Sequence, residues 1–210
     1  MSHGWENRQR RTRSEILAAV GDIIATDGLD GLTMRKLAER ANVAVATLYN
    51  QFTDRNGVLV AFVSSGLDEL ELALDEQPAS PPIDGTRVLL RALDDTIGSA
   101  DHVWRPVLAT LGTSPGSQRM GAVGDRIVGS IEVDLAKARA AGLLYVECDT
   151  NRLARHVFVQ WIRGLERWAQ GTIDWDAYQS NAVLGLELAL AAVLVEPHRA
   201  DALRRAGVVH

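Results

Sequence analysis

The chain of 210 residues has little cysteine, few aromatic residues and no long apolar run. Its single cysteine, Cys148, excludes an internal disulfide and a cysteine-based zinc pair, so we expect a small, partly buried apolar residue there. No segment approaches the roughly 18 consecutive apolar residues that a membrane-spanning helix needs. The first residues, MSHGWENRQRRTRSE, lack the apolar core of a signal peptide. We therefore predict a cytoplasmic protein without a membrane partner.

Positive charge is also in short supply, but it is unevenly distributed. The chain has 22 lysines and arginines against 27 acidic residues, a net charge of -5, which by itself argues against a nucleic-acid partner. Residues 1–56, however, hold eight basic against seven acidic groups, and the rest of the chain holds 14 against 20. A mildly basic N-terminal region on an acidic body keeps DNA binding open.

Nearly every segment has the apolar period of a helix. Thr12 and Glu15 have capping-box spacing, which predicts a first helix from Thr12 to about Gly28. Further helices are expected at Thr33–Arg40, Ala44–Gln51, about 55–77, 85–98, 102–112, 117–141, 150–170, 175–195 and 199–206. LLYVEC, at Leu143–Cys148, is the only candidate strand, and it is short. The predicted fold class is therefore all-α.

The predicted helices fall into two groups. Three short ones form a compact head over residues 1–54, and the others form a larger helical bundle over residues 55–210. The proline-rich stretch QPASPPIDG, residues 77–85, ends the long helix that begins near Arg55. We interpret residues 1–54 as one domain and residues 55–210 as the other.

The stretch LTMRKLAERANVAVATLYNQF, Leu32–Phe52, has the pattern of a helix-turn-helix. Asn42 lies in the joint, where a residue with positive φ is needed and asparagine is the next choice after glycine. In the second helix Ala44, Leu48 and Phe52 recur every four residues and are expected to face inward. The side that then faces outward is short and uncharged, and carries Val45, Ala46, Thr47, Tyr49 and Asn50.

These residues carry a family resemblance. The segment LTMRKLAERANVAVATLYNQFTDRNGVL resembles the DNA-binding signature of the tetracycline-repressor (TetR-type) family of bacterial regulators. The shared features are the capping Thr33, LAERA, the joint that ends in valine, TLY, an aromatic residue three positions after the tyrosine, and a basic residue three further on. The order of the later helices also resembles the ligand-binding and dimerisation domain of that family.

The resemblance implies roles for individual residues. Thr33 would bind a DNA phosphate at its helix start, and Arg35 would reach a guanine edge or a phosphate. Thr47 and Tyr49 would fix the recognition helix against the DNA backbone. Arg55, where the family usually has lysine, would hold the fourth helix on a phosphate and keep the charge.

The sequence also departs from the family pattern. Val45 and Ala46 stand where many relatives have polar residues, basic residues or glycine. Base reading would therefore rest on contacts with thymine methyl groups, on Asn50 and on Arg35. The arginine-rich tail from Arg8 to Arg13 would enter the minor groove or follow phosphates, and a solvated, disordered tail is the alternative.

Small residues near the C-terminus suggest an interface between copies of the chain. Ala182, Gly185, Ala189 and Ala192 follow one helix face, and such residues let a second helix approach closely. Close packing within one subunit is the alternative. The predicted homodimer interface comprises Gly164, Ala182, Gly185, Leu188, Ala189 and Ala192. Two-fold symmetry would require a palindromic operator in double-stranded DNA.

The resemblance also implies an effector cavity in the larger domain. Candidate lining residues are Phe62, His102, Trp104, Met120, Phe158 and Trp161. Aromatic residues at helical spacing are equally compatible with an ordinary core. If they do line a cavity, its ligand would be a small, largely apolar molecule. The long helix that starts at Arg55 would transmit the difference between the states with and without ligand.

Two other classes of protein remain open on the residues alone. An all-α enzyme is disfavoured, because the five histidines form no metal-binding pair and no serine or cysteine lies in a nucleophile motif. A helical adaptor or ligand carrier would have no use for Thr33, Arg35, Tyr49 and Arg55 around a bare helix. We therefore expect a ligand-responsive transcriptional repressor that is not an enzyme and needs no cofactor.

Overall fold

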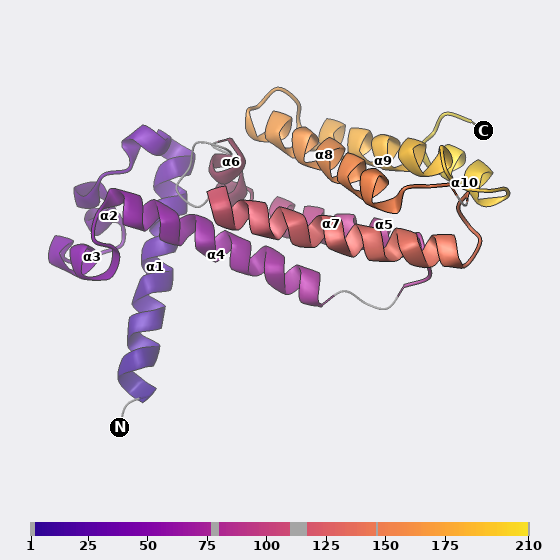
Figure 1. The fold of residues 1–210 in the computed structure, drawn as a ribbon. Coiled ribbons are helices and arrows are strands. Elements are labelled where there is room, and N and C mark those ends of the chain that lie inside the picture. Colours follow the sequence, from indigo (N-terminus) through magenta and orange to yellow (C-terminus); the bar gives the residue numbers. More distant parts are fainter. Residues whose placement is uncertain (1–2, 77–79, 110–116, 146, 210) are drawn as a thin grey trace. The chain divides into compact units, whose positions relative to one another are not determined.

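The computed structural model of the chain describes residues 3–76, 80–109, 117–145 and 147–209, and within them it is all-α, as expected. The helices are α1 (His3–Asp27), the 3-10 turn η1 (Leu29–Gly31), α2 (Met34–Arg40), α3 (Val45–Phe52), α4 (Arg55–Asp75), α5 (Asp84–Ser99), α6 (Asp101–Ala109), α7 (Ser117–Ala140), α8 (Thr150–Ala169), α9 (Trp175–Ala191) and α10 (His198–Arg205) (Figure 1). In the described part of LLYVEC, the only β pairing is a single antiparallel bridge from Leu144 to Leu194. None of the described helices is long and apolar enough to cross a membrane.

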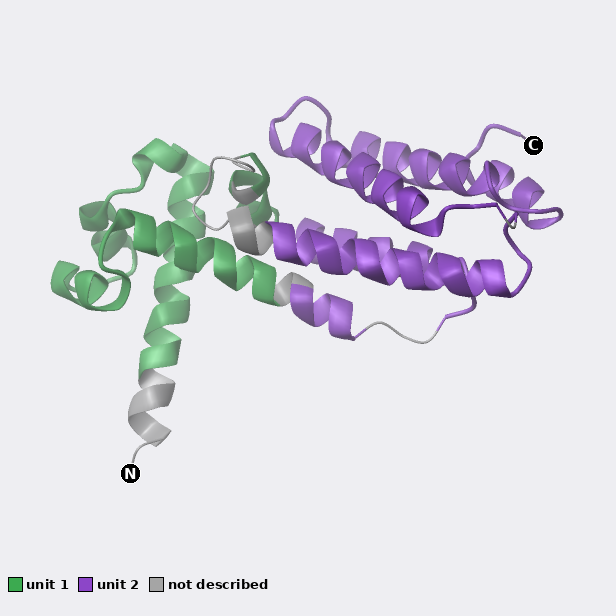
Figure 2. Ribbon diagram, in the orientation of Figure 1, with its two compact units in different colours: residues 1–69, 100–117 green, residues 70–99, 118–210 purple. Residues whose placement is uncertain are grey.

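The chain divides into two compact units (Figure 2). Unit 1 comprises residues 1–69 and 100–117, and unit 2 comprises residues 70–99 and 118–210. Unit 1 therefore contains α1, η1, α2, α3, most of α4 and α6. Unit 2 contains α5 and α7 to α10. These units are defined by packing, whereas the domain division at residues 54 and 55 concerns function and stays a prediction.

The core of unit 1 forms around the apolar stripe of α1. Ile16, Val20 and Ile23 are fully buried, as their helical spacing predicts. Gly21 has no side chain to hold neighbouring helices away, and a Cβ atom there would lie 3.2 Å from the His102 Cδ2 atom and 3.5 Å from the Phe62 ring. Helices α4 and α6 can therefore approach α1 closely at this point.

The first helix begins nine residues earlier than the sequence pattern suggested. The prediction that Thr12 caps its N-terminus is wrong, because α1 starts at His3 and Thr12 lies inside it. Residues 3–11 contain no proline and are rich in Glu, Gln and Arg, which are good helix formers. A capping motif starts a helix only where the preceding residues do not continue it.

In unit 2 a buried carboxylate ties the start of α5 to α7. Asp134 accepts hydrogen bonds from the backbone N–H and from the hydroxyl of Thr86, both at 2.8 Å. Gly85 permits this approach, since a Cβ atom there would lie 2.6 Å from Asp134 Oδ1. The carboxylate thus satisfies a first-turn N–H of α5 that has no partner within the helix.

A second buried contact joins α5 to α9. The Arg87 guanidinium donates two hydrogen bonds of 2.7 Å to the Glu187 carboxylate, with side chains 16% and 4% exposed. Asp84 accepts a further bond of 2.9 Å from Arg87. This bidentate pairing satisfies the charge of Glu187 inside the bundle.

Helices α8 and α9 form a hairpin whose ends follow the sequence signals. Asp149 and Asp174 cap the two N-termini through their carboxylates, and Gly171 takes the positive φ of 72° that ends α8. Gly164 of α8 faces Tyr178 of α9, since a Cβ atom at Gly164 would lie 3.0 Å from that ring. The helices predicted at 150–170 and 175–195 are thus confirmed as α8 and α9, although α9 ends at Ala191.

Candidate nucleic-acid interface

The joint between α2 and α3 has the geometry that a helix-turn-helix requires. Asn42 has φ 52°, which confirms the predicted left-handed residue. The N–H of Asn42 donates to the carbonyl of Glu39, and the N–H of Val43 donates to that of Ala38. These two bonds close the C-terminus of α2 in two residues, so α3 starts at a fixed angle to it.

Helix α3 has one buried side and one bare side. Leu48 and Phe52 are buried in unit 1. Val45 and Tyr49 are 40% and 52% exposed, and Ala46 and Asn50 are also exposed. The predicted outward face is thus present, except that Thr47 is half-buried.

One inward assignment on α3 is wrong. Ala44 was expected to face the core with Leu48 and Phe52, but it is the exposed N-cap residue with ψ 143°. Helical periodicity applies only from the first residue with helical dihedral angles. Ala44 lies one position before it and takes an extended conformation.

The N-terminus of α2, the helix that precedes α3, carries Thr33 and Arg35. The Thr33 hydroxyl accepts a hydrogen bond of 3.2 Å from the N–H of Lys36 and so caps the helix. Arg35 donates to Glu39 at 3.1 Å, and both side chains are largely exposed. An exposed pair of this kind contributes little to stability, so Arg35 can exchange it for another anion at small cost.

Arg55 makes internal contacts that the sequence did not suggest. Its Nε atom donates to the carbonyl of Leu32 at 2.8 Å, and its Nη2 atom donates to that of Leu29 at 2.6 Å. The guanidinium therefore fastens the start of α4 to η1 and the residue before Thr33. A lysine has one nitrogen and could not reproduce this fork.

The turn from α3 to α4 depends on a glycine that the sequence analysis missed. A Cβ atom at Gly57 would lie 1.9 Å from the carbonyl oxygen of Phe52. Thr53 has φ 65°, and the Asp54 carboxylate accepts from the N–H of Gly57 at 2.8 Å. No signal in the sequence indicates this role of Gly57, because the clash involves the backbone oxygen of Phe52, whose position cannot be inferred from residue spacing.

Helix α1 braces the same element. The Arg13 guanidinium lies 4.6 Å from the centre of the Phe52 ring, a cation–π contact. The Lys36 ammonium lies 2.7 Å from Asp27 and, with the Thr26 hydroxyl, lowers the pKa of that carboxyl. Arg11 pairs with Glu15 at 2.9 Å. The arginine-rich segment is thus helical where it is described, which excludes the disordered tail for Arg10, Arg11 and Arg13. The side chain of Arg8 lies outside the described ones.

The aromatic residues proposed for an effector cavity belong to both units. Phe62, His102 and Trp104 lie in unit 1, where Phe62 and Trp104 are buried core residues and His102 is exposed. Phe158 and Trp161 lie in unit 2, with ring centres 6.1 Å apart. The side chain of Met120 lies outside the described ones. Their role in ligand binding stays a prediction.

Trp161 has a polar partner that its sequence position did not reveal. Its Nε1 atom donates to Asp94 at 2.8 Å, and the Tyr178 hydroxyl donates to the same oxygen at 2.5 Å. Burial raises the pKa of Asp94 to about 6, although both hydrogen bonds act in the opposite direction. The trio links α5, α8 and α9.

The small residues proposed for a dimer interface line α8 and α9. Gly164 faces Tyr178 of its own chain, which is the alternative that the sequence left open for this residue. Ala182, Gly185 and Ala189 are half-buried, whereas Leu188 and Ala192 are exposed. The interface itself stays a prediction.

Comparison with known proteins agrees with this geometry. Residues 16–62 match the model of the tetR family of bacterial regulatory proteins. The helix-turn-helix-type transcriptional repressor KstR of Rhodococcus jostii is 30% identical over 84 residues, which are 40% of this chain and 40% of KstR. The regulator BetI of Pseudomonas aeruginosa is 26% identical over 182 residues, which are 83% of this chain and 88% of BetI.

Solved structures show that the whole fold is shared. SmeT, the repressor of the Stenotrophomonas maltophilia multidrug efflux pump SmeDEF, superposes with a TM-score of 0.66 at 21% identity, covering 88% of this chain and 91% of SmeT. NalD, the secondary repressor of the MexAB-OprM pump of Pseudomonas aeruginosa, gives a TM-score of 0.69 at 15% identity, with 90% and 99% covered.

A helix-turn-helix head that matches this family model, followed by a helical C-terminal part, defines a DNA-binding transcriptional regulator. Residues 16–62 carry the DNA-binding signature of the tetR family, and the rest of the chain has the fold of solved regulators such as SmeT. Its relatives are regulators rather than enzymes.

Proposed function

We propose that this protein is a TetR-type, ligand-responsive repressor that releases a palindromic operator when a small effector binds its C-terminal domain. The observation that supports this most directly is the exposed, uncharged face of α3, held outward by the buried Leu48 and Phe52. A helix with one side fixed in a core and a slim free side suits the major groove of DNA.

The head offers a consistent set of contacts for DNA. Thr33 and the first turn of α2 bind a phosphate, and Arg35 leaves Glu39 for a phosphate or a guanine edge. Tyr49 and Thr47 position α3 against the backbone. Val45 and Ala46 contact thymine methyl groups, and Asn50 contacts a base edge. Arg55 acts on DNA indirectly, because its guanidinium already binds Leu29 and Leu32.

The repressor acts as a homodimer, because a palindrome is read by two heads related by two-fold symmetry. Helices α8 and α9 supply the contact in this proposal. They present the exposed Val159, Val183 and Leu188 on the outside of their hairpin. The half-buried Ala189 and the exposed Ala192, on either side of Leu188 in sequence, leave room for a helix of the second subunit.

The effector is a small molecule that binds one arrangement of the two heads better than the other. SmeT has been solved as a complex with triclosan, and that fold neighbour supports a ligand site in the C-terminal domain here as well. Phe62, His102, Trp104, Met120, Phe158 and Trp161 remain the candidates proposed from the sequence.

Selection of bound sequences from random DNA duplexes tests the proposal. We expect a two-fold symmetric site whose half-sites are separated by about one helical turn or a multiple of it. Affinity for this site should fall steeply as salt rises, because phosphate contacts release counterions. Enrichment of no sequence, or of a site without symmetry, would contradict the proposed operator.

Matched substitutions locate the interface. Tyr49→Ala and Arg35→Glu should each weaken operator binding by about tenfold or more, which is the effect of losing one good DNA contact. The controls are Tyr145→Ala and Arg152→Glu, which change exposed side chains of unit 2. If the control variants lose as much affinity as the head variants, α3 is not the reading helix. The ligand-dependent part of the proposal fails if no compound that binds the C-terminal domain alters operator affinity at fixed salt.

A further inference from the structure

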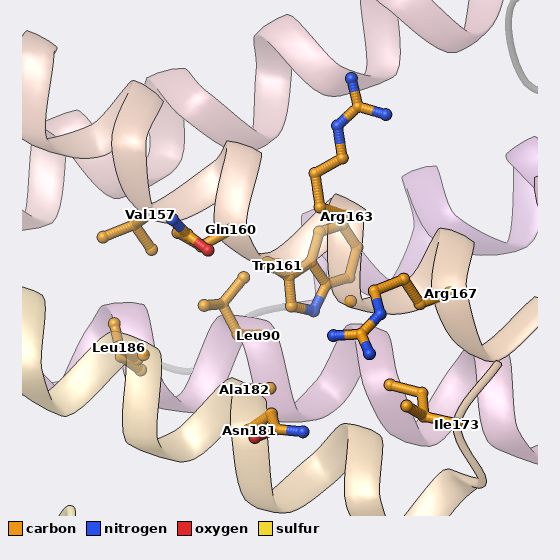
Figure 3. A pocket seen from close by; sticks show the side chains of 12 residues that line it. Leu90, Val157, Gln160, Trp161, Arg163, Arg167, Ile173, Asn181, Ala182 and Leu186 are labelled. Atoms are coloured by element: carbon orange, nitrogen blue, oxygen red, sulfur yellow. The ribbon is translucent and has the colours of Figure 1, made fainter.

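Unit 2 contains a cleft that none of the sequence predictions described. It consists of two adjoining hollows of about 200 and 320 Å³, one between α8 and α9 and one between α5 and α9. Both hollows are lined by Leu90, Trp161, Ala182 and Leu186, so they lie along the same stretch of α9. We call the two hollows together the α9 cleft. In Figure 3, Leu90 points from α5 into the space between α8 and α9.

Small side chains create the α9 cleft, and a hydrogen bond fixes its aromatic wall. Ala182 and Gly185 stand where larger residues would close the space, and a Cβ atom at Gly185 would meet no other atom within 4 Å. Trp161 cannot rotate freely into the cleft, since its Nε1 atom donates to Asp94. The apolar floor is therefore preformed, which favours ligand binding at low entropic cost.

The lining of the cleft is strongly basic, although the chain as a whole is acidic. The two hollows are lined by five arginines, Arg87, Arg91, Arg163, Arg167 and Arg205. The same lining contains only two carboxylates, Asp94 and Glu187, so arginines outnumber acidic residues there although the chain has a net charge of -5. A local surplus of this kind attracts anions into the cleft.

Three of these arginines form no ion pair among the described residues, although Arg205 contributes, after Arg204, to a lowered pKa of Asp201. Arg87 is paired with Glu187, and Arg163 is paired with Glu166 and points away from the cleft in Figure 3. Arg91, Arg167 and Arg205 form no ion pair within the described part of the chain, and the Arg167 guanidinium is directed toward α9 (Figure 3). Arg91 and Arg205 both line the hollow between α5 and α9.

We propose that the α9 cleft binds an amphipathic organic anion. Its apolar or aromatic body packs on Trp161, Leu90 and Leu186, and its carboxylate, sulfonate or phosphate group pairs with Arg91 and Arg205. Guanidinium groups suit such oxyanions because they donate parallel hydrogen bonds. A cationic ligand is disfavoured, since the only carboxylate in the cleft that no arginine binds is Asp94, and one of its oxygens already accepts from Trp161 and Tyr178.

The proposal that the α9 cleft binds an anion does not depend on DNA recognition. The proposal that this anion is the effector rests on the proposed function. It also differs from the cavity expected from the sequence, because Trp161 is the only one of the five candidates with a described side chain that lies in its lining. The ligand class changes accordingly, from largely apolar to amphipathic and anionic.

The test uses two fluorescent probes with the same aromatic body. 1-Anilinonaphthalene-8-sulfonate carries a sulfonate, and N-phenyl-1-naphthylamine is its neutral counterpart. We expect the full-length protein to bind one sulfonate probe per chain, at least about tenfold more tightly than the neutral probe, because one charge-assisted contact is worth about that factor. Calorimetric titration gives both dissociation constants and the stoichiometry.

Variants of the cleft assign the binding to it. Arg91→Gln with Arg205→Gln should remove the preference for the sulfonate probe and leave binding of the neutral probe within about twofold. Ala182→Leu fills the cleft and should weaken both probes without changing the mass in light scattering, which separates the cleft from the proposed subunit interface. Arg152→Gln, which changes an exposed arginine of α8 outside the lining, should alter neither.

Several results would overturn the proposal. Equal affinity for the two probes, or an unchanged preference in the Arg91/Arg205 variant, would exclude an anion site. If that variant instead dissociates a dimer in light scattering, the arginines belong to a subunit interface. Operator affinity is measured in parallel with and without the sulfonate probe. If the probe binds the cleft but does not change operator affinity, the cleft is a binding site without a regulatory role. If the protein binds no operator at all, the proposed function is wrong, and the probe titrations still test the cleft.

Discussion

Single residues decide the geometry of the head, and only some of them could be predicted. Asn42 was predicted because the short joint ANV between the two helices requires a residue with positive φ, which is a local property. Gly57 and Arg55 could not be predicted in their actual roles. Both act on backbone carbonyl groups whose positions depend on how the turn from α3 to α4 folds back.

Gly57→Ala should therefore destabilise the protein. The new methyl group would meet the Phe52 carbonyl at 1.9 Å, so the turn must shift, and we expect a loss of about 1–3 kcal/mol in urea unfolding. Operator affinity should fall as well, because the turn sets the position of α3. The control is Gly129→Ala in α7, where a Cβ atom meets nothing within 4 Å. There the removal of a helical glycine should stabilise by about 0.5–1 kcal/mol. Equal effects of the two substitutions would contradict this account.

Asp94 should make stability depend on pH. Burial raises its pKa from 3.8 to about 6, so between these values the folded protein binds more protons than the unfolded chain. Stability then falls as pH rises through this window, by about 1–3 kcal/mol in total. Asp94→Asn keeps an oxygen that accepts from Trp161 and Tyr178 but has no charge to bury.

The measurement is urea unfolding of both proteins from pH 4 to pH 7.5. The variant should gain stability relative to the wild type as pH rises, and the difference should level off above about pH 7. Asp125→Asn, at an exposed position of α7, serves as the control and should show no such trend. If the difference in unfolding free energy between Asp94→Asn and wild type is the same at every pH, the pKa of Asp94 is not raised in the folded protein.

At the scale of helices, sequence periodicity predicted most elements correctly. Helical residues three and four apart lie on one face, so the apolar stripe of α1 and the buried pair of α3 follow from spacing alone. The ends were less predictable. The capping pattern at Thr12 did not start a helix, because nothing before it prevents α1 from extending to His3. The contacts between helices could not be predicted, because residues far apart in sequence make them. The Arg87–Glu187 pair, for example, spans 100 positions.

That pair should be essential to the attachment of α9 to α5. Glu187→Ala leaves the Arg87 charge in a largely buried position, and we expect a loss of about 3 kcal/mol in unfolding free energy. Adding Arg87→Ala should cost little more, because the two groups act as a unit. Glu147→Ala, at an exposed glutamate, should change stability by less than about 0.5 kcal/mol. Additive losses in the double variant would show that the pair contributes no coupling.

For the whole molecule, the proposed homodimer yields a direct prediction. Light scattering should give a mass of twice 22.8 kDa for the wild type. Leu188→Arg should shift this toward the single chain and weaken operator binding, because it places a charge on an apolar face of α9 that is 42% exposed in one chain. Val133→Arg is the matched control on α7, at a valine that is 55% exposed. A wild-type protein that stays monomeric at working concentration would contradict the dimer.

The sequence by itself determined the all-α class, the helix-turn-helix between Leu32 and Phe52 and the resemblance to TetR-type regulators, because these follow from local spacing, capping and motif residues. Tertiary structure alone decided what depends on distant segments. It placed Gly57 against a carbonyl oxygen and gave the Arg55 guanidinium two carbonyls to bind. It also brought arginines from α5, α8 and α10 around one cleft in an acidic chain. Charge counted along a sequence averages over the whole surface, whereas a ligand meets only the side chains that folding brings together.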